Sequence, residues 1–94
     1  MYLNEKISVI IPTYNRANLI ERSVQSVLEQ IYDNLEVIVV DDGSVDNTME
    51  VVSAFRDNRI VYHKLPINQG VSNARNVGVS VATASLIAFQ DSDD

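Results

Sequence analysis

The chain has 94 residues, no cysteine, and a formal net charge of −6 from 7 Lys and Arg against 13 Asp and Glu. The lack of cysteine excludes disulfides and thiolate zinc sites, and the acidic balance argues against nucleic acid as a partner, because phosphates are bound by clustered basic side chains. The length is that of one small domain, and no apolar segment approaches the roughly 20 residues that span a membrane.

Two strand-and-helix pairs are predicted in the first half of the chain. Ile7 to Pro12 is rich in β-branched residues and ends at a proline, which is typical of a strand. Apolar residues at helical spacing follow between Ala17 and Tyr32. The next strand, Leu35 to Asp42, contains a continuous apolar run, which is typical of a strand buried on both faces. A second helical pattern runs from Ser44 to Phe55 and starts with residues that favour helix N-termini.

The second half repeats this alternation. Arg59 to Leu65 is shorter and more polar, as an edge strand would be, and Gly70 to Ala82 has a helical apolar stripe. A fourth strand is predicted from Ser85 to Gln90. We expect the three apolar helix stripes to face the core, with these members: Ile20, Val24, Val27, Leu28 and Ile31; Met49, Val52 and Phe55; Val71, Ala74, Val77 and Val81.

Strict alternation of strands and helices predicts an α/β fold, a Rossmann-like parallel sheet of about four strands with helices on both faces. Ligands of such sheets bind at the carboxyl ends of the strands. The motifs "PTYNR", "DDGSVDN" and "DSDD" each directly follow a predicted strand. We therefore expect a binding site where these motifs meet.

The first motif offers an aromatic face and a cation. Tyr14 can stack on a flat ring, and Arg16 can bind a phosphate. By itself the motif is equally typical of a strand-to-helix turn with Arg16 in solvent. In the second motif, an aspartate of the pair Asp41 and Asp42 could accept a hydrogen bond from a ligand N–H. Alternatively, the acidic pair could simply form a turn, with Ser44 and Asp46 capping the next helix.

The last motif has carboxylates at alternate positions. Asp91 and Asp93 can both reach one ion, and Mg²⁺ and Mn²⁺ commonly join one or two carboxylates to substrate phosphates. A solvated acidic tail is the alternative. Arg75 lies on the third predicted helix and is either a surface residue or a neighbour of an anionic group at the helix N-terminus.

Four stretches, "SVIIPTYNR", "EVIVVDDGSVDNT", "NQGVSNARNVGV" and "LIAFQDSDD", resemble in order and spacing the N-terminal nucleotide-sugar-binding part of inverting family 2 glycosyltransferases with the GT-A fold. The resemblance covers nearly all of residues 1–94. It implies that these residues are one part of a longer GT-A domain, cut after a D-x-D element.

The resemblance also implies roles for particular positions. Pro12, Thr13 and Tyr14 would form the base pocket, and Asp42 would hydrogen-bond the base. Two arginines, Arg16 and Arg75, would lie near the nucleotide, with Arg75 toward the diphosphate. Asp91 would lie toward the ribose, and Asp93 would bind the divalent cation, Mn²⁺ or Mg²⁺; these are the two metal-site residues, and Asp94 has no assigned role.

The implied reaction transfers a sugar from a nucleotide-diphospho-sugar, first of all a UDP-sugar, to a glycan or lipid-linked acceptor of bacterial polysaccharide synthesis. The family's general base is an aspartate downstream of the D-x-D element, so we expect these residues to bind the donor without transferring sugar. We expect the longer protein in the cytoplasm, at the inner face of the membrane if its acceptor is lipid-linked. The uncovered fourth strand predicts self-association.

Two other classes stay open on the residues alone. A phosphoacceptor receiver domain also has an acidic pair after a buried strand and binds Mg²⁺, although its pair follows the first strand and it has no use for "PTYNR". The other alternative is a non-catalytic nucleotide-binding module.

Overall fold

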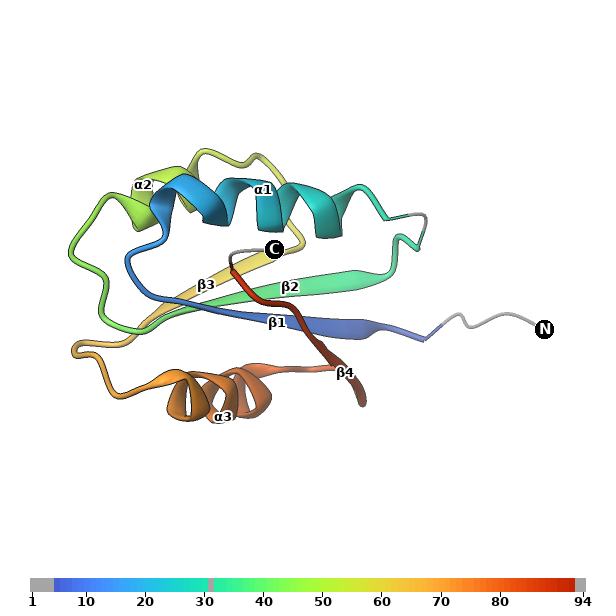
Figure 1. Ribbon diagram of the computed structural model, residues 1–94. Helices are drawn as coiled ribbons and strands as arrows, with labels where there is room; N and C mark the ends of the chain where they lie inside the picture. The colour runs from blue at the N-terminus through green and yellow to red at the C-terminus, as the bar shows by residue number, and fades with distance from the viewer. Residues whose placement is uncertain (1–4, 31, 93–94) are drawn as a thin grey trace.

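The strands form one sheet in the order β3-β2-β1-β4, and every neighbouring pair is parallel (Figure 1). The structure is a computed structural model that describes residues 5–30 and 32–92. The strands are β1 (Ile7–Thr13), β2 (Leu35–Asp41), β3 (Ile60–Lys64) and β4 (Leu86–Phe89). The predicted four-stranded parallel α/β sheet is confirmed, and β3 lies at an edge as its polarity indicated.

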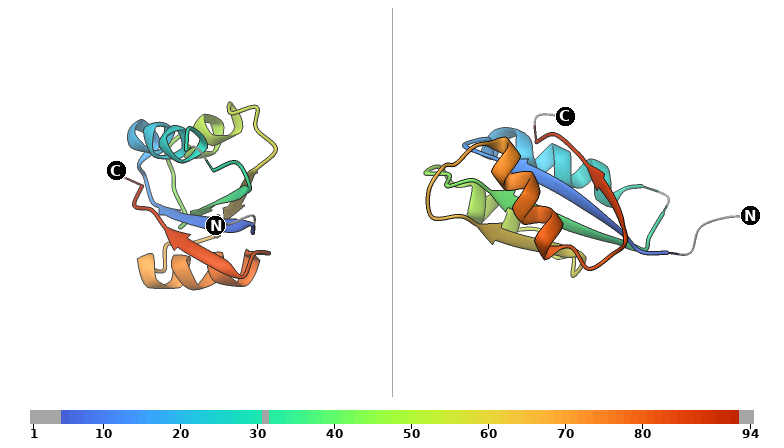
Figure 2. Two further views of the ribbon diagram at one scale, coloured as in Figure 1. Left: turned by 90° about the vertical axis from the view of Figure 1, so that its right-hand side faces the viewer. Right: turned by 90° about the horizontal axis from the view of Figure 1, so that it is seen from below.

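The helices cover both faces of the sheet. Helices α1 (Ala17–Leu28) and α2 (Thr48–Ser53) pack on one face, and α3 (Val71–Val81) packs on the other, as the two further views also show (Figure 2). None of the helices in the described ranges is long and apolar enough to cross a membrane.

Side chains of the central strands alternate between two apolar clusters. One cluster faces α1 and α2 and contains Val9, Ile11, Val37 and Val39. The other contains Ile10, Ile38 and Val40, which pack against Ala74 of α3. All seven residues of β2 are buried. The continuous apolar run therefore marks a strand covered on both faces, as predicted.

Two predicted core positions are wrong. Met49 is 46% exposed and Val71 is 51% exposed, although each falls on its helix's apolar stripe. Both lie in the first turn of a helix whose start is close to the carboxyl edge of the sheet. At that edge only one side of each first turn is covered: Thr48 and Ala74 are buried, whereas Met49 is exposed and Val71 lines pockets at the strand ends. Ile31, also predicted as core, lies outside the described residues.

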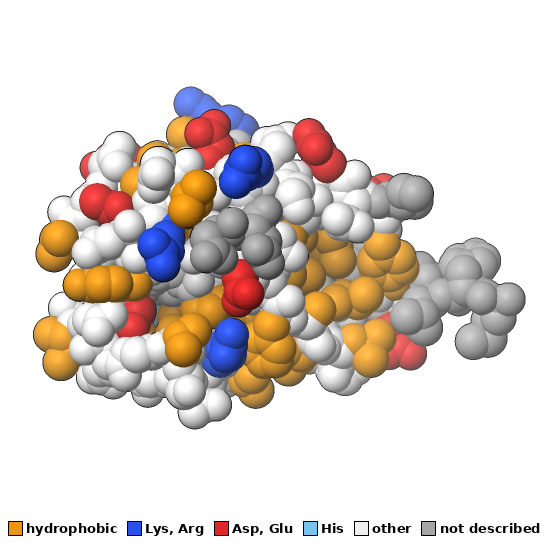
Figure 3. Space-filling view, in the orientation of Figure 1, with side chains coloured by type: hydrophobic (Ala, Val, Ile, Leu, Met, Phe, Trp, Pro, Cys, Tyr) orange, Lys and Arg blue, Asp and Glu red, His pale blue; other side chains and the backbone are white. Residues whose placement is uncertain are grey.

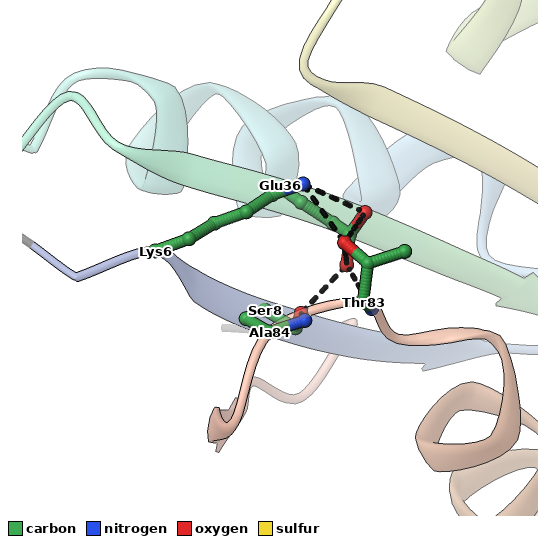
Figure 4. A network of polar contacts seen from close by, with 5 residues as sticks. All are labelled: Lys6, Ser8, Glu36, Thr83 and Ala84. Carbon is green, nitrogen blue, oxygen red and sulfur yellow. Dashed lines mark hydrogen bonds and ion pairs between the residues drawn. The ribbon is translucent and has the colours of Figure 1, made fainter.

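A polar network at the opposite edge of the sheet fixes the approach to β4 (Figure 4). Glu36 on β2 is 7% exposed, and its carboxylate accepts hydrogen bonds from the Ser8 hydroxyl at 2.6 Å and from the Thr83 amide at 2.8 Å. Lys6 lies 3.4 Å from the same carboxylate, and the Ala84 amide donates to Ser8 Oγ at 3.2 Å. The network thus ties the α3–β4 connection to β1 and β2 and places β4 beside β1.

Candidate functional site

The carboxyl ends of β1 and β2 lie at the same edge of the sheet, where Thr13 pairs with Asp41. A pocket of about 270 Å³ opens there. It is lined by Pro12, Thr13, Tyr14, Arg16, Asp42, Asn68, Gly70, Val71, Ala74 and Ser92. Five residues predicted as site residues, from two separate motifs, therefore line one pocket.

A second pocket of about 290 Å³ adjoins the first, because Pro12, Arg16, Val71 and Ser92 line both. Asp91 lines this second pocket. We call the two pockets together the strand-end cleft. The cleft brings the start of the last motif next to the first motif, although 75 positions separate Arg16 from Asp91 in the sequence.

Arg75 does not line the strand-end cleft, but it pairs with Asp91, which does. Its guanidinium nitrogen Nη2 lies 3.6 Å from Asp91 Oδ1, and its Cζ lies 6.0 Å from the centre of the Phe89 ring. The two charged side chains are 42% and 60% exposed, so their pairing contributes little to stability and leaves Arg75 free to exchange partners. Asp93 and Asp94 lie outside the described residues, and the placement predicted for Asp93 stays a prediction.

Asp42 has a second task besides lining the cleft. It is 3% exposed, and its carboxylate accepts hydrogen bonds from the Gln69 amide at 2.9 Å, the Gly70 amide at 2.8 Å and the Asn68 side chain at 2.9 Å. Three donors thus hold residues 68–70 as the opposite wall of the cleft. A carboxylate has about four acceptor positions, so one remains for a ligand N–H.

The neighbouring carboxylate, Asp41, points away from this wall into the protein. It is completely buried and accepts hydrogen bonds from the Ser44 amide at 2.8 Å and from the Tyr62 hydroxyl. Burial of Tyr62 and its bond to Asp41 raise the pKa of the Tyr62 hydroxyl, so it stays a proton donor. Of the acidic pair, Asp41 is structural and Asp42 belongs to the cleft.

Glycine is required where the loops of β2 and β3 meet. Gly43 has a φ of +79°, and a Cβ there would lie 2.7 Å from the backbone nitrogen of Asn68. The residue after the acidic pair therefore has no room for a side chain. The close approach brings Asn68 within reach of Asp42.

The segment after β4 is anchored from α1. The Ser23 hydroxyl, on a completely buried side chain, donates a 2.7 Å hydrogen bond to the Asp91 carbonyl, and the Gln90 amide bonds Ile10 of β1 at 3.0 Å. Asp91 is thus held by its backbone on one side, while its side chain points toward Arg75.

Sequence reasoning missed five cleft residues, Asn68, Gly70, Val71, Ala74 and Ser92. Val71 and Ala74 read as core because they continue an apolar stripe, and Asn68 stands in a stretch without helical or strand periodicity. Two signals were available for Asn68: its position shortly after a strand end and its place at the start of the stretch "NQGVSNARNVGV". Thr13, which was predicted, has a buried hydroxyl without a hydrogen-bond partner among the described residues, as expected where a ligand completes the bonding.

The described residues were also tested for a fit to a divalent cation. They contain no group of three or more His, Asp or Glu side chains that could hold a metal ion. Mg²⁺ and similar ions need only one or two carboxylates when substrate phosphates and water supply the other ligands. The half-exposed Asp91 carboxylate at the rim of the cleft, beside two arginines that suit phosphate, fits that kind of site.

The chain is similar to glycosyltransferases both in sequence and in structure. The family model described as "Glycosyl transferase family 2" matches residues 8–94. A relative from Escherichia coli, UDP-Glc:alpha-D-GlcNAc-diphosphoundecaprenol beta-1,3-glucosyltransferase WfaP, is 40% identical over 90 residues, which cover 96% of this chain and 36% of that protein.

Two solved structures show the same arrangement of the chain. Mannosyltransferase PcManGT from Pyrobaculum calidifontis, in complex with GDP-Man and Mn²⁺, superimposes with a TM-score of 0.88 at 33% identity over 97% of this chain and 28% of its own. S. aureus TarS 1-349 in complex with UDP-GlcNAc gives 0.86 at 36% identity, over 94% of this chain and 26% of its own. The chain thus spans about a quarter to a third of the lengths of these relatives.

Proposed function

The chain belongs to glycosyl transferase family 2, and from this premise we propose that the protein containing it transfers a sugar from a nucleoside-diphosphate donor. The observation that carries the proposal is the strand-end cleft, which combines an aromatic ring, a buried carboxylate and a cation. Tyr14, Asp42 and Arg16 line it from two different loops. UDP is the first nucleotide to consider, and GDP the second, because the solved relatives hold UDP-GlcNAc and GDP-Man.

Each of these side chains suits one part of such a donor. The Tyr14 ring is 44% exposed and can stack on the base. The remaining acceptor position of Asp42 suits the imide N–H of uracil. Arg16 lies in both pockets of the cleft and suits the diphosphate, with Arg75 as the second cation once it leaves Asp91.

The reaction we propose is a direct displacement with inversion. An acceptor hydroxyl attacks the anomeric carbon, the bond from that carbon to the diphosphate oxygen breaks, and the hydroxyl proton passes to a general base. We assign no described residue as that base and place it, as the resemblance implies, in a part of the protein beyond Asp94. Sugar transfer by these 94 residues alone, with contaminating enzyme excluded, would contradict this assignment.

We propose Asp91 and Asp93 as the residues that hold a divalent cation, Mn²⁺ or Mg²⁺. Such a cation would offset the negative charge of the diphosphate. The protein's own contribution is to present Asp91 at the rim of the cleft through its bond to Ser23. The Mn²⁺ in the PcManGT complex supports this proposal.

For the acceptor we propose a glycan or a lipid-linked sugar. The name of WfaP, a glucosyltransferase acting on a diphosphoundecaprenol-linked sugar, supports a lipid-linked acceptor. A lipid-linked acceptor would place the protein at the inner face of the membrane.

Two other functions were open on the residues alone, a phosphoacceptor receiver domain and a non-catalytic nucleotide-binding module. The chain does not belong to the receiver family, whereas a family member that has lost activity would still bind nucleotide.

Calorimetric titration with UDP and with GDP, each with and without Mn²⁺, tests the donor site. We expect UDP to bind in the presence of Mn²⁺ and Arg16→Ala to weaken binding about tenfold, because a charge-assisted hydrogen bond to phosphate is lost. Asp42→Asn should weaken binding as well, since its amide group would face the donors of residues 68–70.

Arg22→Ala is the matched control, because Arg22 is an exposed arginine on α1 that does not line the strand-end cleft. Equal affinities for the Arg16 and Arg22 variants, or no nucleotide binding by the unmodified chain, would contradict the proposal.

A further inference from the structure

The residue between the aromatic and the cationic side chain of the cleft has an unusual backbone conformation. Asn15 stands between Tyr14 and Arg16 and has a φ of +51°; it is the one non-glycine residue with positive φ in residues 5–30 and 32–92. This left-handed conformation is unfavourable for most side chains, and asparagine is among the few that adopt it readily. It turns the chain sharply at the end of β1, so Tyr14 and Arg16 both reach the cleft.

Asn15 is bonded in both directions to the loop that follows β2. The backbone amide of Asn15 donates a hydrogen bond to Ser44 Oγ at 2.8 Å, and its side-chain Oδ1 accepts one from the Val45 backbone amide at 2.9 Å. These two hydrogen bonds join loops that lie about 30 positions apart in sequence. We call Asn15, Ser44 and Val45 the loop clasp.

The far side of the loop clasp is itself fixed. Ser44 is 3% exposed, and its amide donates to the buried Asp41 carboxylate. Two residues after Ser44, Asp46 accepts the Ala17 backbone amide at 3.1 Å through one carboxylate oxygen and the Thr48 backbone amide at 3.1 Å through the other. The first turns of α1 and α2 are therefore held by the same loop, which makes the β2–α2 loop a rigid support for the β1–α1 loop.

We propose that Asn15 is a positioning residue of the donor site: its two bonds to the β2–α2 loop hold Tyr14 and Arg16 where base and diphosphate bind. Asn15 is not among the residues that line the strand-end cleft, so it acts through its neighbours. The identity of the ligand rests on the proposed function, whereas the geometry of the loop clasp is independent of that function.

The two contributions of Asn15, its backbone conformation and its side-chain bond, are separable by substitution. Asn15→Gly keeps the left-handed conformation and loses the bond to Val45, whereas Asn15→Ala loses both. Ser44→Ala removes the acceptor of the Asn15 amide from the opposite loop. Asn15→Asp keeps the acceptor and tolerates the conformation, and Asn18→Asp adds the same charge in the first turn of α1 without touching the loop clasp.

The test measures UDP affinity in the presence of Mn²⁺ beside the free energy of unfolding for each variant. Loss of one such hydrogen bond changes an equilibrium constant by about fivefold, and the apparent dissociation constant rises with the fraction of chains whose loop is misplaced. We expect the dissociation constant to rise by up to about fivefold for Asn15→Gly and Ser44→Ala, and by more for Asn15→Ala. Asn15→Asp and Asn18→Asp should have the same affinity as each other.

If Asn15 had a merely structural role, its substitution would lower the free energy of unfolding and leave the affinity for UDP unchanged. Glu36→Gln is the reference for that outcome, because it weakens a polar network at the opposite edge of the sheet. Unchanged affinity in Asn15→Ala, in a variant that is still folded, would overturn the inference.

Nuclear magnetic resonance of the Tyr14 ring and the Arg16 side chain, without ligand, keeps the inference testable if no nucleotide binds. Loss of UDP binding by the unmodified chain would refute the proposed function only. Shifted or averaged Tyr14 and Arg16 signals in Asn15→Ala would still support the loop clasp, and unchanged signals would overturn it.

Discussion

Two adjacent aspartates show how strand geometry divides tasks between residues of the same type. Asp41 is the last residue of β2 and points into the protein toward Tyr62, whereas Asp42 lies one position further and faces the strand-end cleft. Side chains of a strand alternate between its faces, so neighbours of identical chemistry meet different surroundings. The residues alone left open whether the pair binds a ligand or forms a turn, and only the resemblance singled out Asp42.

Glu36 is the residue whose charge we expect to matter most for stability. Burial works to raise its pKa, but hydrogen bonds from Ser8 and Thr83 and the charge of Lys6 outweigh it and lower the pKa below the ordinary value of 4.5. Glu36→Gln should lower the free energy of unfolding by about 1–3 kcal/mol near neutral pH, because an amide nitrogen would face hydrogen-bond donors.

The pH dependence of that difference follows from the lowered pKa. The carboxylate's contribution is complete above the unfolded pKa, near 4.5, and disappears as the pH falls through the lower folded value. Urea unfolding of Glu36→Gln and the unmodified chain should therefore differ near neutral pH and converge in acid. Glu21→Gln, on the exposed face of α1, is the control; equal effects of the two substitutions would contradict the prediction.

Among the elements, α3 lies closest to the sheet, and Gly78 explains why. A Cβ at this position would lie 2.4 Å from Cγ2 of Ile10 on β1. The glycine that weakens the helix on propensity grounds therefore permits the helix to pack directly on the strand.

Gly78→Ala should lower the free energy of unfolding by about 1–3 kcal/mol, since overpacking outweighs the gain in helix propensity of at most about 1 kcal/mol. Chemical denaturation measures the change. Val79→Ala, one position along the same helix at a residue 44% exposed, should have little effect. A Gly78→Ala variant as stable as the unmodified chain would show that α3 can move away from Ile10.

Most of the element structure was predictable because apolar runs and helical stripes recur without interruption. Strand ends fell within one residue of the predicted limits. Two helices were overpredicted: α1 ends at Leu28 instead of Tyr32, and α2 covers Thr48–Ser53 instead of Ser44 to Phe55. The exposure of Met49 and Val71 could not be read from periodicity, since it depends on where the sheet ends.

For the whole molecule, the sheet order places β4 at an edge with poor cover. Ile87 is 37% exposed and Phe89 is 53% exposed. The view of this side shows hydrophobic side chains crossing the surface over β4, next to charged side chains (Figure 3). An uncovered edge strand with apolar neighbours favours pairing with another chain.

We therefore expect this chain to self-associate with rising concentration in sedimentation velocity experiments. Phe89→Ser should shift the distribution toward the monomer, because it removes the largest exposed apolar side chain of β4. Val45→Ser, at a residue 88% exposed on a distant loop, should leave the distribution unchanged. A monomer at all concentrations would refute the expectation.

The spatial order of the strands was the part of the molecule that sequence alone left undetermined. Strict alternation indicated a parallel sheet, and the motifs indicated that its carboxyl edge carries the site. The arrangement of β4 beside β1 comes from contacts between distant residues, above all those of Glu36 with the α3–β4 connection. Such pairings leave no periodic trace in a single sequence.

The walls of the strand-end cleft come from the ends of β1 and β2, from residues 68–74, and from the segment after β4. No part of the chain builds it without the others. A bound nucleotide should therefore stabilise the entire sheet. The chain should melt in one cooperative transition, and the gain in its free energy of unfolding should grow with the logarithm of the nucleotide concentration.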